Sequence, residues 1–165
     1  MERASNIKVY ARVRPPMPSD YRPDIEGVPR LSTCIHTDAT HVHATKDEAT
    51  AAAMQADGID AVDGHRVDRF KVDAVFDPDA SQVRVFDAVT PRMTDALLAG
   101  VDCSLIVYGA CATGKTYTAV GTEQNPGILP QIADYLYNQI GRSVDVTYSV
   151  SLSVVQVFNE KIFNV

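Results

Sequence analysis

The sequence has few cysteines, no long apolar run and no excess of basic residues. Its three cysteines show neither CxxC spacing nor another metal-site spacing, so we expect reduced thiols rather than a disulfide framework. No apolar run approaches the length of a membrane-spanning helix, and the N-terminus lacks the apolar segment of a signal peptide. A net charge of −6 and an isoelectric point near 5.1 give no support for binding to nucleic acid or to anionic membranes. We therefore expect an intracellular protein without nucleic-acid or membrane partners.

Apolar residues recur with the periods of strands and helices along much of the chain. A composition of 45% hydrophobic and 22% charged residues over 165 positions is typical of one soluble globular domain. Alternation with a period of two predicts strands over 6–14, 69–77 and 144–158, and a short apolar run predicts a buried strand over 105–108. Strands that alternate with helices indicate the α/β class.

Helical spacing over 82–99 predicts the first long helix. Ser81 is a favoured N-cap residue, and Gly100 is a favoured residue just past a helix end. Pro91 lies inside this pattern and should kink or split the helix.

Two further helices are predicted after residue 114. One begins at Lys115 and is soon broken, because Gly121-Thr-Glu-Gln-Asn-Pro-Gly127 is a loop signal. The other begins near Pro130, a residue favoured at the first helical position, and runs to Gly141.

Residues 19–68 are interpreted as a loop-rich insertion. Residues 33–45 favour a β-hairpin with its turn at 38–40. His41 and His43 point the same way on such a strand, but no matching cysteine or carboxylate set accompanies them, so we do not expect a metal site. The Ala- and Asp-rich segment 46–64 favours a solvated insertion or a short peripheral helix.

A glycine-rich stretch connects a predicted strand to a predicted helix. Residues 109–116 read Gly-Ala-Cys-Ala-Thr-Gly-Lys-Thr and match the phosphate-binding pattern G-x-x-x-x-G-K-[ST]. Gly109 and Gly114 allow positive φ, so backbone N–H groups can turn inward as an anion nest at the positive end of a helix. Lys115 would reach the β- and γ-phosphates, and the Thr116 hydroxyl would ligate Mg²⁺. The alternative, an ordinary strand–turn–helix junction, is less favoured because the required flanking elements are predicted.

Two features near this loop stay open. Cys111 lies among inward N–H groups and near Lys115, which would favour a thiolate that alkylates readily, but a passive loop residue is an equal alternative. Arg12 and Arg14 share one face of the first predicted strand, which is either a solvated face or a wall beside the nucleotide.

Other stretches, in a characteristic order, accompany the loop. The first strand ends in Arg12-Val-Arg14-Pro15, an Arg-x-Arg-Pro motif. The further motifs are Phe70–Asp77, Ser81–Phe86, Leu98–Gly100, Val107–Thr118, Gly127–Pro130 and Val157–Ile162. Together they run from Ile7 to Phe163 and resemble the kinesin motor domain from its N-terminal end.

The resemblance implies ATP and ADP as nucleotides, Mg²⁺ as the metal, and ATP hydrolysis coupled to movement along microtubules in the intact motor. It implies a P-loop NTPase-type three-layer sandwich, with a central sheet between helices, and a location on the cytoskeleton in the cytoplasm. Arg12, Arg14 and Pro15 would border the adenine and ribose, with Tyr117 on another side of the base. The implied nucleotide-binding residues are Gly109, Ala110, Cys111, Ala112, Thr113, Gly114, Lys115, Thr116, Tyr117, Arg12, Arg14 and Pro15.

The sequence departs from the family pattern in two ways. Ala110-Cys111-Ala112 replaces the usual Gln-Thr-Gly/Ser, so a side-chain amide and a hydroxyl are lost while the backbone N–H groups remain. The family's Asn-x-x-Ser-Ser-Arg and Asp-x-Ala-Gly-Ser-Glu switch motifs and its main microtubule-binding helices are not found in 1–165. We therefore expect the N-terminal half of a motor domain, an incomplete fold without a catalytic residue that binds nucleotide without productive turnover. An unpaired edge on its apolar central strand would favour self-association.

Two other functions stay open. A stand-alone nucleotide-binding or interaction module would share the loop and hydrolyse nothing. A small P-loop kinase is less favoured, because such kinases usually place the loop on their first strand, whereas here it begins at residue 109.

Overall fold

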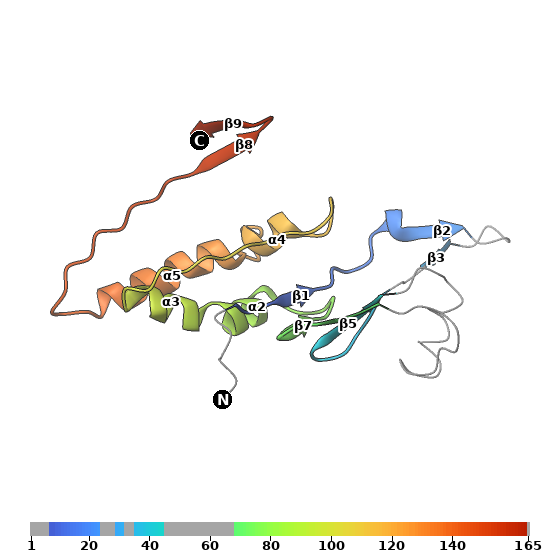
Figure 1. Cartoon of the computed structure of the whole chain (residues 1–165), viewed down its shortest axis with the longest axis horizontal. Helices are drawn as coiled ribbons and strands as arrows, with labels where there is room; N and C mark the ends of the chain where they lie inside the picture. Colours follow the sequence, from blue (N-terminus) through green and yellow to red (C-terminus); the bar gives the residue numbers. More distant parts are fainter. Residues whose placement is uncertain (1–6, 24–28, 32–34, 45–67, 165) are drawn as a thin grey trace.

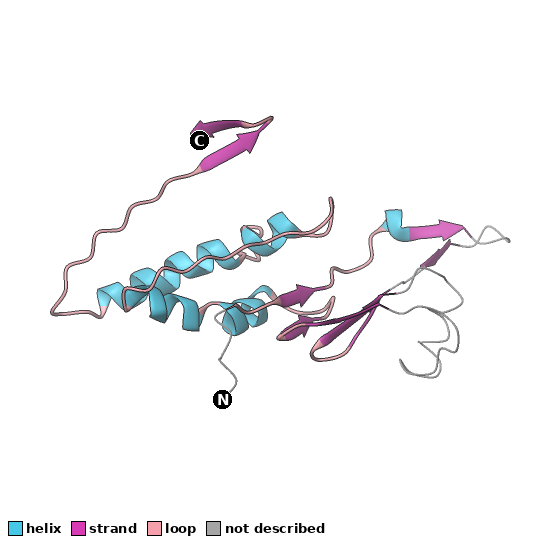
Figure 2. Ribbon diagram, in the orientation of Figure 1, coloured by secondary structure: helices cyan, strands magenta, loops and turns pink. Residues whose placement is uncertain are grey.

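The chain combines short strands with helices. The structure is a computed structural model that describes residues 7–23, 29–31, 35–44 and 68–164 (Figure 1). Its strands are β1 (Tyr10–Arg12), β2 (Tyr21–Pro23), β3 (Pro29–Leu31), β4 (Ile35–Thr37), β5 (His41–Ala44), β6 (Asp68–Lys71), β7 (Ala74–Phe76), β8 (Val155–Phe158) and β9 (Lys161–Asn164). Its helices are the 3-10 helix η1 (Pro18–Asp20), α2 (Gln82–Val89), α3 (Pro91–Leu98), α4 (Lys115–Ala119) and α5 (Ile128–Gly141) (Figure 2). The α/β class predicted from the sequence is confirmed.

The described strands pair in small sheets. β1 and β7 are parallel, with Tyr10 opposite Ala74 and Arg12 opposite Phe76. β4, β5 and β6 form an antiparallel sheet, and β2–β3 and β8–β9 are antiparallel pairs. Within the described part of the predicted strand 6–14, the ladder covers Tyr10–Arg12. The hydrogen bonds from Asp73 N–H to Val9 O and from Val13 N–H to Phe76 O continue the contact by one residue at each end.

The predicted hairpin over 33–45 is confirmed in its described part. Asp38 closes the turn by accepting hydrogen bonds from the N–H groups of Thr40 and His41, each at 2.8 Å. The rings of His41 and His43 also reach the Asp38 carboxylate, each at 3.2 Å. Within the described residues, no three or more His, Cys, Asp and Glu side chains are arranged to hold a metal ion.

The predicted strand over 69–77 divides at Asp73. Asp73 donates its N–H to Val9 O at 2.7 Å, and its carboxylate accepts from Lys8 Nζ and from the Val9 N–H, each at 2.8 Å. These contacts, with the Lys8 hydrogen bond the largest cause, lower the pKa of Asp73 below its ordinary value. Because Asp73 binds the first segment of the chain, β6 stays with the hairpin while β7 joins β1.

The predicted helix over 82–99 is confirmed, and it is split as expected. The Ser81 hydroxyl accepts from the Arg84 N–H at 3.2 Å and caps α2. Pro91 begins α3, where its missing N–H has no helical partner to lose. Gly100 follows α3 with φ 87° and donates its N–H to Leu97 O at 3.0 Å.

Helix α5 begins earlier than the sequence predicted. Gly127 is its N-cap, so Pro130 is the third helical residue rather than the first. The first four N–H groups of a helix have no intrahelical partner, so proline is tolerated there as well. The predicted end at Gly141 is confirmed.

A small apolar core joins β7, α2 and α5. Its buried members are Phe76, Ala80, Val85 and Ile128. The partly buried residues packed against it are Tyr10, Val89, Leu105 and Ile132. The core therefore fixes the turn before α2 against β1, beside the cavity described below.

The predicted strand over 105–108 is wrong as a hydrogen-bonded element. Residues 102–108 form no backbone–backbone hydrogen bond within the described chain, and a strand requires such a partner. Their side chains still alternate: Leu105 and Val107 are half-buried, whereas Ile106 and Tyr108 are 79% and 82% exposed. The predicted alternation of side chains is therefore present, but the hydrogen bonds to a neighbouring strand are absent from this described segment.

The long strand predicted over 144–158 is also wrong for most of its length. Residues 144–154 run as an extended segment away from α5, and only β8 at its end pairs, with β9 (Figure 1). Val144 and Leu152 are 93% and 89% exposed. Alternation alone cannot supply the missing partner.

Two further predictions concern the segment 46–64 and membrane-spanning helices. The segment 46–64 lies outside the described residues. In the part of the chain that is described, no helix has both the length and the apolar character needed to cross a membrane.

Candidate functional site

Residues 109–116 form a loop that turns directly into α4. Gly109, Ala112 and Gly114 have φ of 150°, 59° and 91°. A Cβ added at Gly109 would lie 2.8 Å from Thr113 Oγ1, so a side chain there would have to displace the Thr113 hydroxyl. The left-handed conformation at Ala112 costs about 1–3 kcal/mol, and such strain gathers at functional loops.

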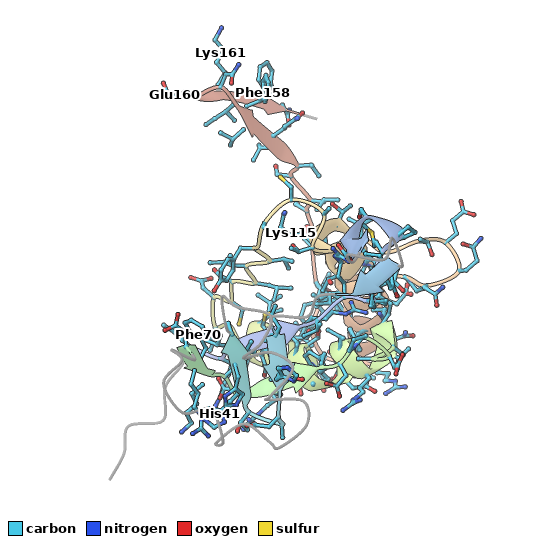
Figure 3. The ribbon with its side chains drawn as sticks, turned by 90° about the vertical axis from the view of Figure 1, so that its right-hand side faces the viewer. His41, Phe70, Lys115, Phe158, Glu160 and Lys161 are labelled. Atoms are coloured by element: carbon cyan, nitrogen blue, oxygen red, sulfur yellow. The ribbon has the colours of Figure 1, made fainter. Side chains whose placement is uncertain are left out.

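Lys115 folds back over this loop. Its Nζ donates to Gly109 O at 3.0 Å and to Ala110 O at 2.6 Å, and Figure 3 shows it beside the loop. Thr113 Oγ1 donates to the same Ala110 carbonyl at 2.8 Å. The Thr113 hydroxyl and the Lys115 ammonium group thus share the Ala110 carbonyl, which fixes the loop and keeps the ammonium group beside it.

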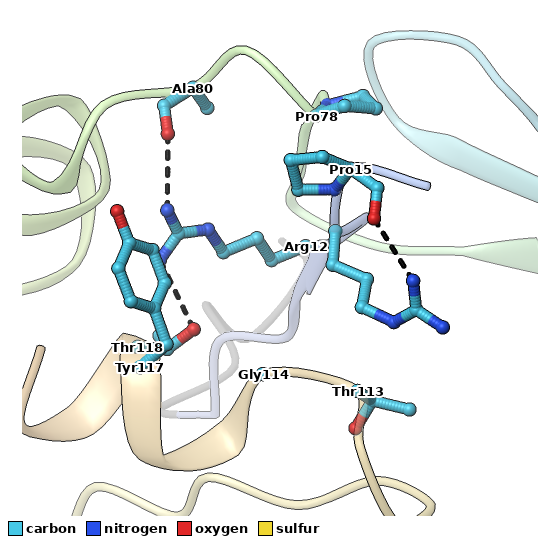
Figure 4. Close-up of a pocket in the computed structure, with 9 residues that line it drawn as sticks. Arg12, Pro15, Pro78, Ala80, Thr113, Gly114, Tyr117 and Thr118 are labelled. Atoms are coloured by element: carbon cyan, nitrogen blue, oxygen red, sulfur yellow. Dashed lines mark hydrogen bonds between the residues drawn. The ribbon is translucent and has the colours of Figure 1, made fainter. Parts of the chain in front are cut away.

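Arg12 connects three segments of the chain. Its guanidinium donates to Gln82 Oε1 at 2.7 Å, to Thr118 Oγ1 at 3.1 Å and to Ala80 O at 3.1 Å. It also lies 5.2 Å from the centre of the Tyr117 ring, within the range of a cation–π contact (Figure 4). Burial lowers the pKa of Arg12 from its ordinary value, yet a guanidinium stays charged at neutral pH.

Arg14 pairs with a carboxylate instead. Its two terminal nitrogens donate to Asp20 at 2.6 and 2.8 Å, and one of them also donates to Pro15 O at 2.9 Å. Asp20 accepts a further bond from the Met17 N–H at 2.7 Å. The Arg14 and Met17 hydrogen bonds lower the pKa of Asp20 to about 2, so the pair is ionised at neutral pH.

An open cavity of about 220 Å³ lies between these groups. β1, the turn before α2, and the start of α4 enclose it (Figure 4). Its lining residues are Arg12, Arg14, Pro15, Pro78, Ala80, Thr113, Gly114, Tyr117 and Thr118.

The structure brings half of the predicted binding residues to this cavity. Those that line it are Arg12, Arg14, Pro15, Thr113, Gly114 and Tyr117. The others belong to the adjoining loop and the first turn of α4, namely Gly109, Ala110, Cys111, Ala112, Lys115 and Thr116. Cys111 is exposed on that loop.

Sequence reasoning missed several contributors. Gln82 and Asp20 hold the two arginines, and the remaining missed residues are cavity-lining: Pro78, Ala80 and Thr118. A signal for Gln82 was available, because a half-buried arginine on a strand needs acceptors and Gln82 follows a capping serine. No comparable signal marked Asp20.

Comparisons with known proteins bear on the same residues. A family model described as the kinesin motor domain matches residues 12–165. The chain belongs to the kinesin motor domain family. The kinesin-like protein KIF18B of Gallus gallus is 33% identical over 159 residues, which cover 94% of this chain and 19% of that protein. The protein claret segregational of Drosophila melanogaster is 28% identical over 166 residues, which cover 99% of this chain and 21% of that protein.

A solved kinesin structure shows the same fold. KIF14 with ADP, in complex with a microtubule, matches with a TM-score of 0.66 and 23% sequence identity, covering 96% of this chain and 41% of that chain. The kinesin motor fold, of the α/β P-loop NTPase type, is thereby confirmed for this chain. The chain spans about a fifth of the length of these curated relatives.

Proposed function

We propose that this chain is the ATP-binding part of a kinesin-type motor that moves along microtubules of the cytoplasmic cytoskeleton. The base and ribose occupy the cavity, and the phosphates lie on the loop 109–116. The observation that carries the proposal is that residues 12–15 and 113–118 line one cavity, next to a glycine-rich loop that opens a helix. The ADP and the microtubule in the solved KIF14 complex support both parts of the proposal.

The loop has the donors that a phosphate needs. Within the described chain, the backbone N–H groups of 109–114 form no backbone–backbone hydrogen bond. Inward N–H groups and a positive helix end attract anions. Lys115 is bonded to two neutral carbonyls, and a phosphate oxygen is a stronger, charge-assisted partner for the same ammonium group. Lys115 therefore turns from the loop carbonyls to the phosphates when nucleotide binds.

The first turn of α4 fits a magnesium–nucleotide complex. Thr116 is exposed there, one residue past Lys115, and its hydroxyl forms no hydrogen bond with another described residue. A hydroxyl oxygen suits Mg²⁺, which prefers hard oxygen ligands and takes most of them from phosphates and water. Thr116 supplies the protein ligand, and the bound ion would neutralise phosphate charge.

Arg12, Pro15 and Tyr117 hold the base and ribose. The Arg12 guanidinium lies over the Tyr117 ring, and Pro15 lies across the cavity from them (Figure 4). Because the family's switch motifs are not found in the sequence, we propose that this chain binds nucleotide without productive turnover.

Substitution of Lys115 tests this function directly. Lys115→Ala should weaken the binding of a fluorescent ADP analogue by roughly 10- to 150-fold, the effect of losing a hydrogen bond to a charged group. Lys161→Ala is the matched control, because Lys161 lies on the C-terminal hairpin away from the loop (Figure 3). Equal affinities of the wild type and Lys115→Ala, or no binding by the wild type, would refute the proposal.

A further inference from the structure

Gln82 is a buried polar side chain at the start of α2, with 5% of its surface exposed. Its amide bonds away from its own helix. Oε1 accepts from Arg12 at 2.7 Å, and Nε2 donates to Tyr117 O at 2.6 Å and to Asn125 O at 3.4 Å. A buried amide without partners costs about 1–3 kcal/mol, so these bonds decide where the side chain lies.

The same bonds fix which way the amide faces. The reversed orientation would turn the NH₂ group toward the Arg12 guanidinium and Oε1 toward two carbonyl oxygens. Donor would then face donor and acceptor would face acceptor. Gln82 therefore presents one defined acceptor to Arg12.

The Tyr117 carbonyl depends on Gln82. The Gly121 N–H, which would bond this carbonyl in a longer helix, donates instead to Thr116 O at 3.1 Å. The last carbonyls of a helix need partners from outside it, and the Gln82 amide supplies one. The end of α4 that carries Tyr117 is thus tied to α2.

Gln82 does not itself line the cavity, but both residues it holds do. Arg12 and Tyr117 come from β1 and α4, which are about a hundred residues apart in the sequence and meet through the guanidinium–ring contact. The relative position of these two residues sets the width of the side of the cavity assigned above to the base.

We propose that Gln82 is a positioning residue that sets the affinity for the nucleoside part of the nucleotide. It acts through Arg12 and Tyr117, and it does not touch the ligand. This inference rests on the proposed function, since it concerns the base side of the same site. The hydrogen bonds of Gln82 go to Arg12, Tyr117 and Asn125 and to no described residue of the loop 109–116, so phosphate affinity should not depend on it.

The experiment compares ADP with inorganic pyrophosphate, which has no base or ribose. Gln82→Met keeps the length of the side chain and removes its hydrogen bonds; Gln82→Glu keeps the acceptor toward Arg12 and removes the donor toward Tyr117. In Gln82→Met, the dissociation constant for ADP should rise by up to about tenfold, because the loss of positioning cannot exceed the worth of the hydrogen bond to Arg12, while that for pyrophosphate stays unchanged. Gln82→Glu should show a selective loss as well.

Val85→Ala is the control for lost stability. Val85 is 2% exposed in the core on the same helix and lies outside the cavity, so its loss should leave the ratio of the two affinities unchanged. Wild-type ADP affinity in a folded Gln82 variant, or a parallel loss of ADP and pyrophosphate affinity, would overturn the role of Gln82 alone. A wild type that binds neither compound would overturn the proposed function itself.

Discussion

Arg12 and Arg14 are two residues apart, yet they have different partners. Arg12 bonds to Gln82 and contacts the Tyr117 ring, whereas Arg14 pairs with Asp20 just past the prolines. The alternation predicted both on one face of a strand; β1 ends at Arg12, so Arg14 lies beyond the strand, yet both line the cavity. Their partners could not be read from the alternation, because Gln82 is 70 residues away from Arg12.

The Arg14–Asp20 pair predicts a pH dependence of stability. The pKa of Asp20 falls from 3.8 to about 2, first because of the Arg14 hydrogen bond and then because of the Met17 N–H. Since the folded pKa is the lower one, the pair stabilises the fold above about pH 4, and this contribution is lost as the pH falls toward 2. Asp20→Asn should therefore flatten the pH dependence of the urea midpoint in this range.

The control for that measurement is Asp145→Asn, which removes an exposed carboxylate from the extended segment after α5. Its pH dependence should match that of the wild type. An Asp20→Asn variant whose midpoint falls with acid as steeply as the wild type would show that the pair does not contribute.

At the scale of elements, local sequence signals were most informative for α2 and α3. Ser81 caps α2, Pro91 begins α3 and Gly100 follows the end of α3, so each signal acts within one or two turns of a helix end. Strands need a second segment, and the sequence says little about which segment that is. The strands predicted at 105–108 and 144–158 therefore had the right periodicity without the ladder.

Removal of the α2 cap should have a measurable cost. Ser81→Ala loses the bond to the Arg84 N–H and should lower the free energy of unfolding by about 1 kcal/mol. Ser81→Gly is the matched comparison, because glycine at an N-cap costs only a few tenths of a kcal/mol. Chemical denaturation of the wild type and both variants measures these losses; a Ser81→Ala variant as stable as the wild type would mean that the hydroxyl does not cap the helix.

At the scale of the whole molecule, two described segments expose apolar side chains and backbone groups without ladder partners. They are 102–108 and 144–154. Both are rich in β-branched and aromatic residues with few charges, and such segments pair readily with other strands. We expect the chain to self-associate at micromolar concentrations or to be marginally stable alone.

Sedimentation velocity tests this expectation. The wild type should sediment faster than a monomer, and Ile106→Lys or Leu152→Lys should shift it toward the monomer by placing a charge at an exposed apolar position. A wild type that is a clean monomer with sharp two-state unfolding would contradict the expectation.

The conformation of the loop 109–116 was predictable from the sequence, because its motif is local. The phosphate loop needs glycines, a lysine and a threonine at fixed spacing, and the structure shows positive φ at Gly109 and Gly114. The residues that hold the two arginines were not predicted. Gln82 and Asp20 act through side-chain hydrogen bonds that no sequence-spacing rule describes.

The central claim is that the loop 109–116 holds the phosphates of a nucleotide whose base lies between Arg12 and Tyr117. Amide hydrogen exchange in the presence and absence of Mg²⁺ and ADP tests it residue by residue. Binding should slow exchange in 109–118 and in 10–14, and Lys115→Ala should abolish this protection. Bound ADP with unchanged exchange in 109–118, and protection elsewhere in the chain, would contradict the claim.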